Sequence, residues 1–301
     1  GVPREATNVL PSELSQITFL KGAQAVVLYG SKAAKGAILI TTKRGKVDGI
    51  KVDVTANTGW YVAKSYPEYL SSAEYMTLYN KGRASDGLSP LYKDEIYDFG
   101  AGDNPYRYPN VDYYSSDYIR KAYNRSEATA EIEGGGKRAH FYSNINFYRV
   151  GDVFKFGEAK HNHTNRFNVR GNVDVNISDD IKAYVNANAT FYDASSAKGD
   201  YWSTAASMRP NYPQNAAPLI PIDYISPSAT NAWALINNAN LIDGKYFLAG
   251  SQENSTHIFG DIYSAGKTKY TSRQFQFDTG IKINLAKLLK GLSFETKFAV
   301  D

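Results

Sequence analysis

Cysteine is absent from the 301-residue sequence. Its absence excludes disulfide bonds, thiolate-bound structural zinc and a cysteine nucleophile, and it leaves the redox compartment undetermined. No run of about 18 apolar residues is present either, so no transmembrane helix is predicted. The opening GVPREATNVLPSEL lacks the features of a signal peptide and is typical of the middle of a domain, so we expect a piece of a longer protein.

The chain also has little net charge. Lys and Arg together number 34 and Asp and Glu number 30, which gives +4 at pH 7. Nothing here indicates binding to nucleic acid, which requires a clustered basic face. What the chain does contain is 24 Tyr and 14 Phe beside abundant Asn, Thr and Gly. This mixture favours strands and turns over helices.

Apolar and polar residues alternate through most of the chain after residue 50. In RFNVRGNVDVNI (166–177) every second residue from Phe167 onwards is apolar or glycine, and the residues between are Arg, Asn and Asp. A period of two predicts β-strands, and one face of each predicted strand lacks Asp, Glu, Lys and Arg altogether. The predicted strands are 51–60, 128–132, 141–148, 166–177, 181–192, 275–284 and 292–301.

Two architectures account for this alternation. One is a soluble antiparallel sheet with a single wet face. The other is a transmembrane barrel, in which the apolar face meets lipid and the polar face lines the lumen. Several predicted strands have the length of about ten residues that a tilted membrane strand requires, whereas soluble strands usually have about five or six.

The connections between the predicted strands favour the barrel. Short connections alternate strictly with long ones, as in outer-membrane barrels with tight periplasmic turns and long extracellular loops. Aromatic residues also gather at the strand ends next to the long connections, which predicts an aromatic girdle at one membrane interface. These residues are Trp60, Tyr61, Phe147, Tyr148, Phe167, Phe191, Tyr192 and Phe275. The long connections are 61–126, 149–165 and 193–272.

Two stretches within the long connections predict local structure. Ser71 and Glu74 fit a capping box before AEYMTLYNKG, so a short helix is expected there with Gly82 ending it. The segment 209–227 contains five prolines and is expected to be an ordered extended loop and not a strand.

The segment before the strands has a different texture. ITFLKGAQAVVLYGSKAAKGAILITTKRGK (17–46) predicts a strand at 17–21, a helix at 23–28, a tight turn at 29–31 and a buried strand at 37–42. This stretch closely resembles the end of the plug domain of TonB-dependent outer-membrane transporters of the SusC/RagA type. The residues that carry the resemblance are Leu20, Lys21, Tyr29, Gly30, Gly36, Thr41, Thr42, Lys43 and Gly45.

Later stretches resemble the barrel of the same family, among them SSAEYMTLYN, YPNVDYYSSDYI, NRFNVRGNVDVNISDDIKAY and LLKGLSFE. The resemblance implies an all-β fold with a small α+β plug segment. Residues 1–46 would be the carboxy-terminal part of the plug, and 47–301 the first strands and extracellular loops of a transmembrane antiparallel barrel. It also implies that the TonB box and the first half of the plug precede Gly1, and that most of a barrel of about 22 strands follows Asp301.

The resemblance implies active import across the outer membrane of a Gram-negative bacterium, of the Bacteroidota by resemblance. Energised TonB would act on a segment upstream of this chain, a SusD-like surface lipoprotein would serve as a hinged lid, and the cargo would be an oligosaccharide or a peptide. No enzymatic activity, cofactor or metal is expected.

Several residues are candidates for contacts within such a transporter. Charged residues on the predicted lumen faces are candidates for salt bridges to the plug: Lys51, Asp53, Arg166, Arg170 and Asp174. Loop aromatics that could stack on a cargo ring are Tyr201, Trp202, Tyr212 and Trp233. Glu131 and Glu133 could bind a cation or hold the plug, although ordinary lumen charge is the simpler interpretation.

Two alternatives from other classes remain open. A soluble β-rich carbohydrate-binding module would use the same aromatic residues and would need no membrane. A passive porin would share the barrel but needs no plug, and residues 16–46 are difficult to reconcile with it. His161 and His163 are expected to be solvated loop residues, because no pair of carboxylates accompanies them.

Overall fold

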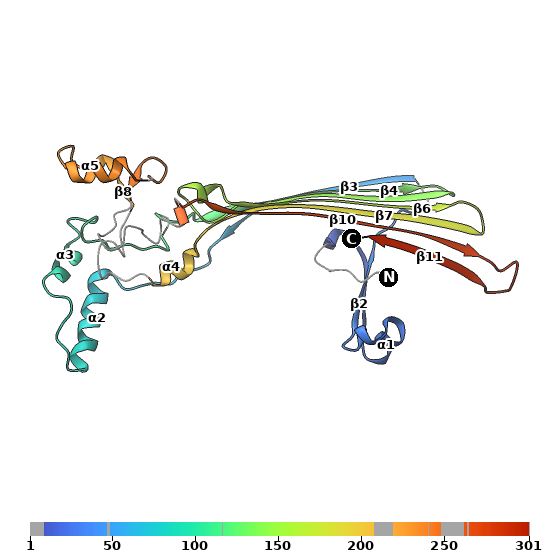
Figure 1. Ribbon diagram of the computed structural model, residues 1–301, viewed down its shortest axis with the longest axis horizontal. Coiled ribbons are helices and arrows are strands. Elements are labelled where there is room, and N and C mark those ends of the chain that lie inside the picture. Colours follow the sequence, from blue (N-terminus) through green and yellow to red (C-terminus); the bar gives the residue numbers. More distant parts are fainter. Residues whose placement is uncertain are drawn as a thin grey trace.

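The computed structural model describes residues 9–46, 49–115, 117–207, 219–239, 241–247, 262–263 and 265–300. A long antiparallel sheet forms its centre, the amino-terminal segment hangs from one face of the sheet, and the long connections gather beyond one end of the strands (Figure 1). None of the helices in the described ranges is long and apolar enough to cross a membrane.

All seven predicted strands are present, and they pair as an antiparallel meander in the order β11-β10-β7-β6-β5-β4-β3. Short connections alternate with long ones, as predicted, and the short turns share one end of the sheet. The strands are β3 (Gly49–Val62), β4 (Ala122–Gly135), β5 (Ala139–Val150), β6 (His163–Asn176), β7 (Ile181–Ala197), β10 (Lys267–Asn284) and β11 (Ser293–Val300).

Most of these strands extend beyond their predicted limits. The clearest case is β4, which was predicted at 128–132 but begins at Ala122. Its first residues include Asn124, Arg125 and Glu127, so both faces are polar there and the alternation disappears. The ladder to β3 nevertheless continues from Gly135 to Ala122. Alternation therefore marks only the stretch in which the outer face is apolar.

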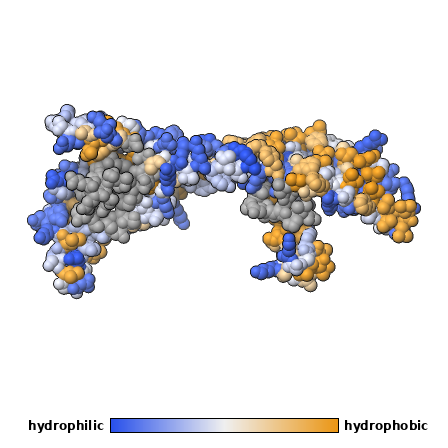
Figure 2. Space-filling model, in the orientation of Figure 1, coloured by the Kyte–Doolittle hydropathy of each residue, from blue (hydrophilic) through white to orange (hydrophobic). Residues whose placement is uncertain are grey.

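The polar face of the sheet is buried and the apolar face is exposed, which is the reverse of a soluble protein. Asn144, Asn168 and Asn172 on the polar face are buried, and Asn144 is 0% exposed. On the apolar face Val54 is 71% exposed, and Phe275 is exposed as well. Figure 2 shows hydrophobic surface over the part of the sheet towards the short turns and a hydrophilic zone between it and the loops. An apolar outer band on a polar-lined sheet is the pattern of a transmembrane barrel.

The register of the strands collects aromatic residues at the loop side of this apolar band. Phe147 lies opposite Phe167, and Phe167 lies opposite Phe191. The rings of Phe167 and Phe191 are 6.0 Å apart, and the ring of Phe275 packs edge-on against Phe191 at 5.7 Å. These four residues form one row across four strands, at the position where an interfacial girdle is expected.

The amino-terminal segment consists of β1 (Leu14–Leu20), α1 (Ala23–Tyr29) and β2 (Ala37–Thr42), with β1 and β2 paired antiparallel. The limits of β2 match the prediction, β1 begins three residues earlier, and α1 is one residue longer. The predicted turn at 29–31 is a helix end: Gly30 has φ +72 and donates its N–H to Val26 O at 2.8 Å. A 3₁₀ turn, η3 (Ser31–Ala33), follows it.

The helix predicted in the first long connection is α2 (Ser72–Ser85), and its capping box is present. Ser71 Oγ accepts from the Glu74 N–H, and Glu74 Oε2 accepts from the Ser71 N–H at 2.9 Å. The predicted end at Gly82 is wrong. The helix ends at a Schellman motif in which Gly87 has φ +71 and Leu88 N donates to Arg83 O at 2.9 Å.

Several other elements were not predicted from the sequence. They are α3 (Glu95–Ala101), α4 (Tyr201–Ser207), α5 (Thr230–Asn237), the 3₁₀ turns η2 (Pro11–Glu13), η4 (Glu158–His161) and η5 (Ile222–Tyr224), and the short strands β8 (Ile220–Pro221) and β9 (Tyr246–Phe247). The expectation that 209–227 contains no strand is wrong at β8, which pairs with β9. Pro221 has no N–H, and Ile222 N supplies the next bond by donating to Lys245 O at 3.0 Å. Residues 209–218 lie outside the described ranges.

The exposed apolar face leads to a testable expectation. Val54→Arg should destabilise the sheet in a bilayer by about 2–4 kcal/mol, because a lipid-facing cation loses its hydration. On a water-exposed surface the same change would be within about 0.5 kcal/mol of neutral. Unfolding by denaturant of the complete protein in lipid vesicles measures the difference. Asn57→Arg, on the polar face of the same strand, is the matched control and should change stability little; equal effects of the two variants would contradict a lipid-facing surface.

Candidate functional site

The amino-terminal segment contacts the polar face of the sheet through a fully buried carboxylate. Glu13 is 0% exposed, and its Oε2 lies 2.9 Å from Arg170 Nε of β6. This contact is an ion pair without the alignment of a hydrogen bond. Asn168 Nδ2 donates to Glu13 Oε1 at 3.0 Å, and Leu10 N donates to Oε2 at 3.1 Å. A buried carboxylate requires partners of this kind, because desolvation of an unpaired charge is costly.

The local fold brings Glu13 to this position. Pro11 opens the 3₁₀ turn η2, where a residue without an N–H and with fixed φ is well accommodated. The Glu13 N–H returns to Leu10 O at 3.0 Å, and Glu13 O accepts from Lys43 N at 2.8 Å. The turn is thereby fixed to the start of β1 and to the end of β2 at the same point.

A second group of contacts forms where the chain leaves β2. Lys43 Nζ lies 2.8 Å from Glu131 Oε2 of β4, and the Tyr142 hydroxyl of β5 donates to the same oxygen at 2.9 Å. Arg44 NH1 lies 2.5 Å from Asp174 Oδ1 of β6. Together with Glu13, these residues pair the segment with two strands, β4 and β6, and Tyr142 of the strand between them bonds the same Glu131 carboxylate.

Further contacts hold residues 43–45 on the sheet. Asn172 Nδ2 donates to Lys43 O at 2.9 Å, and the Arg44 guanidinium lies 5.5 Å from the centre of the Tyr184 ring. Gly45 passes so close to β5 that a Cβ atom there would lie 2.3 Å from Phe141 O. Only glycine permits this approach, so the segment leaves the face of the sheet at a defined place.

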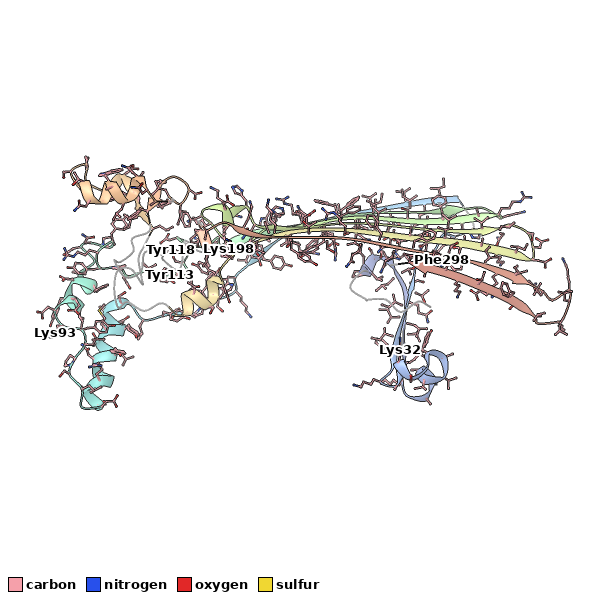
Figure 3. All side chains as sticks on the ribbon, in the orientation of Figure 1. Lys32, Lys93, Tyr113, Tyr118, Lys198 and Phe298 are labelled. Atoms are coloured by element: carbon pink, nitrogen blue, oxygen red, sulfur yellow. The ribbon has the colours of Figure 1, made fainter. Side chains whose placement is uncertain are left out.

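The long connections fold together beyond the strands and enclose a second candidate site. We call residues 63–121 and 151–162, with the described parts of 198–266, the loop assembly. Its buried core takes residues from all three connections, including Tyr114, Phe154 and Tyr201. Figure 3 shows Tyr113 and Tyr118 inside the assembly, whereas Lys32 lies at the far end of the amino-terminal segment.

An open cleft of about 1020 Å³ lies in the loop assembly. Its walls come from residues 66–75, 110–115 and 205–206 and from Lys121. Beside it three aromatic rings lie nearly parallel. The rings of Tyr69 and Tyr114 are 5.3 Å apart at 11°, and those of Tyr114 and Trp202 are 5.7 Å apart at 19°.

Hydrogen bonding and burial fix the middle of this stack. The hydroxyls of Tyr69 and Tyr114 share a hydrogen bond of 3.4 Å. Burial, followed by this hydrogen bond, raises the pKa of Tyr114 to about 12. The phenol is therefore protonated at neutral pH. Burial also raises the pKa of Tyr113 and of Tyr118, so the tyrosines of this region are uncharged.

No protein-family model matches the chain. Among curated proteins, the TonB-dependent receptor P26 of Formosa agariphila is 26% identical over 211 residues, which cover 69% of this chain and 20% of that protein. The TonB-dependent receptor SusC of Bacteroides thetaiotaomicron is 36% identical over 83 residues, or 27% of this chain and 8% of SusC.

The solved structures agree with these sequence relatives. The RagAB peptide transporter superposes with a TM-score of 0.67 at 16% identity, covering 97% of this chain and 32% of that chain. The resemblance to SusC/RagA-type TonB-dependent transporters is confirmed. The chain spans about a fifth or less of these curated relatives and about a third of the matched RagAB chain.

Within the SusC/RagA-like fold, the residues of the predicted plug motif lie along the amino-terminal segment. Leu20 ends β1 and Lys21 follows it, and Tyr29 ends α1 before Gly30. Gly36 has φ +111, and a Cβ atom there would lie 3.0 Å from Leu20 O. Thr41 and Thr42 close β2 against β1.

The predicted lumen residues of this fold divide into two groups. Arg170 and Asp174 contact the amino-terminal segment, as described above. Lys51 and Asp53 pair with each other at 2.5 Å on β3, and Arg166 lies over the Tyr148 ring at 5.5 Å. Reasoning from the sequence missed Glu13.

Glu131 and Glu133 are not ordinary lumen charge. Glu131 pairs with Lys43, and Glu133 lies 3.9 Å from Lys46 Nζ. Their spacing of two on one strand face, facing a segment that ends in TTKRGK, is the signal in the sequence that indicates this role.

The predicted loop aromatics also differ in their surroundings. Trp202 belongs to the stack beside the cleft. Tyr201 is 1% exposed, and its hydroxyl donates to Tyr113 O, so the prediction that it stacks on cargo is wrong. Trp233 Nε1 donates to Ser226 O at 3.0 Å and lies outside the walls of the cleft. Tyr212 lies outside the described residues.

The structure gives little indication of metal binding. Within the described ranges, no group of three or more His, Asp or Glu side chains is arranged to hold a metal ion. His161 ends η4 and His163 begins β6, and His163 Nδ1 lies 2.8 Å from His161 O.

Glu13→Gln tests the buried ion pair. It should destabilise the attachment of the amino-terminal segment by about 3–5 kcal/mol, because Arg170 is left charged, nearly buried and unpaired. Glu133→Gln is the control: Lys46 is exposed and 3.9 Å away, so the change should be about 0–1 kcal/mol. Limited proteolysis of the complete protein across a urea series measures both. Equal destabilisation by Glu13→Gln and Glu133→Gln would show that the buried pair does not stabilise the attachment.

Gly45→Ala tests the close backbone approach. The new Cβ atom would overlap Phe141 O, a backbone atom that cannot rotate away, so the segment must shift from the sheet. We expect faster proteolytic release of the segment than in the unmodified protein. Gly59→Ala is the matched control, because a Cβ atom at Gly59 has open space around it. Indistinguishable release from the two variants would show that the approach is not tight.

Proposed function

We propose that this chain is part of a TonB-dependent importer that carries a nutrient across the outer membrane of a Gram-negative bacterium. The observation that carries the proposal is the pairing of the charged amino-terminal segment with the buried polar face of a sheet whose other face is apolar and exposed. Such a sheet is stable in lipid, and a segment held inside it by ion pairs obstructs the polar path.

In this proposal residues 1–46 are the carboxy-terminal part of a plug, and 47–301 are strands and extracellular loops of the barrel. Energised TonB pulls on a segment of the complete protein that precedes these residues. Opening the path then requires separating Glu13 from Arg170, Lys43 from Glu131 and Arg44 from Asp174. Water that enters the lumen can solvate these charges as they separate, so a polar interface suits a plug that moves repeatedly.

We propose a SusD-like surface lipoprotein as the partner and an oligosaccharide or a peptide as the cargo. The similarity to SusC and to RagAB supports both assignments. The solved structures include the RagAB peptide importer in 'open-open' and 'closed-closed' states, which supports an importer that changes between open and closed forms. The relatives are receptors and transporters, so we assign no enzymatic reaction.

The alternatives fit the molecule less well. A soluble carbohydrate-binding module would pack apolar residues such as Val54, Phe275 and Phe277 against a core, whereas these side chains are exposed. A passive porin would have no use for a segment that makes polar contacts with β4, β5 and β6.

Removal of the TonB-binding segment from the complete protein tests this function. Cells with the deletion should lose energised uptake of cargo, whereas the purified variant should bind cargo as the unmodified protein does. The physical reason is that the binding surface lies in the loops and the coupling to TonB lies on the other side of the membrane. The two measurements are cargo uptake by cells that carry the deletion and cargo binding by the purified variant in detergent.

Native purification from membranes supplies the control for the partner. The intact protein extracted in detergent should bring a surface lipoprotein with it, identified by mass spectrometry. Uptake that survives the deletion would refute energised import, and a protein that purifies from the soluble fraction without detergent would refute the membrane assignment.

A further inference from the structure

The aromatic stack beside the cleft ends in an open ring. Tyr114 is buried between the other two rings, Trp202 is 44% exposed outside the cleft walls, and Tyr69, which lines the cleft, is 58% exposed. The Tyr66 ring packs beside this stack, 6.3 Å from Tyr114 and 6.5 Å from Trp202. The Tyr69 ring is thus fixed by its neighbour while one side of it remains accessible. A ring that is already ordered loses little conformational entropy when a ligand stacks on it.

Carboxylates outnumber cations in the walls of the cleft. Glu68, Glu74 and Asp112 line the cleft, against the single cation Lys121 among its walls. Hydrogen bonds from Ser71 lower the pKa of Glu74, so this carboxylate is ionised at neutral pH. Carboxylate oxygens accept hydrogen bonds from hydroxyl groups and repel anions. The walls therefore favour an uncharged ligand rich in hydroxyls over an acidic one.

No sheet edge is among the described residues that line the cleft. A peptide commonly binds by adding a strand to a free sheet edge. The walls of this cleft come from loop residues, α2 and α4, and Lys121 precedes the first residue of β4. The volume of about 1020 Å³ lies at the upper end of the range for small-molecule sites and has room for several linked rings.

From these observations we propose that the cleft is a cargo subsite for a neutral oligosaccharide, with one sugar ring stacked on Tyr69 and its hydroxyls donating to the carboxylates of Glu68, Glu74 and Asp112. The inference rests on the proposed function and specifies its cargo class. Tyr69 makes the ring contact, and Tyr114 and Trp202 position it.

The test measures retention of defined ligands by the complete protein with its partner, purified in detergent. The probes are short neutral oligosaccharides of several sugar types, uronic-acid oligosaccharides of matched length, and a mixed library of uncharged peptides. We expect retention of a neutral oligosaccharide. Tyr69→Ala should weaken that binding about tenfold or more, since the stacking surface is lost, and Tyr69→Phe, which keeps the ring, should bind within about threefold of the unmodified protein.

Tyr97→Ala is the matched control, because Tyr97 is an exposed tyrosine of α3 outside the cleft walls. It should leave binding unchanged. The inference is overturned if Tyr69→Ala binds like Tyr97→Ala, if the retained ligand is a peptide or an acidic oligosaccharide, or if none of the probes is retained. Each of these results concerns binding alone, so TonB-dependent uptake of another cargo can still be measured separately.

Discussion

The burial of a charged carboxylate under a polar sheet face is the constraint on which the rest of the molecule depends. Glu13 has no exposed surface, so it requires a charge and hydrogen-bond donors on the sheet, which Arg170 and Asn168 provide. A sheet face that provides such groups cannot also be a hydrophobic core. The apolar residues of the same strands therefore point the other way, and that face is stable only where lipid covers it.

This arrangement also explains why the contact between segment and sheet is made of ion pairs. An apolar interface would hold the segment more uniformly, but its separation in a water-filled lumen would expose hydrophobic surface. Charged groups on the segment and on the sheet are both hydrated once they have separated. Lys43, Arg44 and their partners Glu131 and Asp174 are partly exposed, so only the Glu13 pair has a large desolvation term.

The sequence predicted those parts of the fold that local chemistry determines. Five largely apolar residues after Gly36 defined β2, and alternation located all seven strands of the sheet. The ends of β4 were missed because both of its faces become polar beyond the lipid-facing stretch. Gly82 was taken as the helix end, but the left-handed backbone that ends α2 is at Gly87, and residue type alone does not distinguish the two.

The candidate site was harder to predict, because its pairs are set by the fold. Glu13 and Asn168 are 155 residues apart, and nothing local to either residue identifies its partner. The position of Arg170 and Asp174 on the predicted lumen face did indicate them as candidates. The same criterion also selected Lys51 and Asp53, which pair with each other. The burial of Tyr201 depends on a core assembled from three separate connections.

The strands are longer than the membrane requires, and this has a geometric consequence. β10 has 18 residues, roughly 60 Å at about 3.4 Å per residue, whereas a tilted strand crosses a bilayer with about 9–11 residues. The surplus lies beyond the aromatic row and is hydrophilic (Figure 2). It forms a rigid collar that raises the loop assembly above the lipid headgroups. In the proposed importer a ligand would therefore reach the cleft from the side without first displacing the membrane surface.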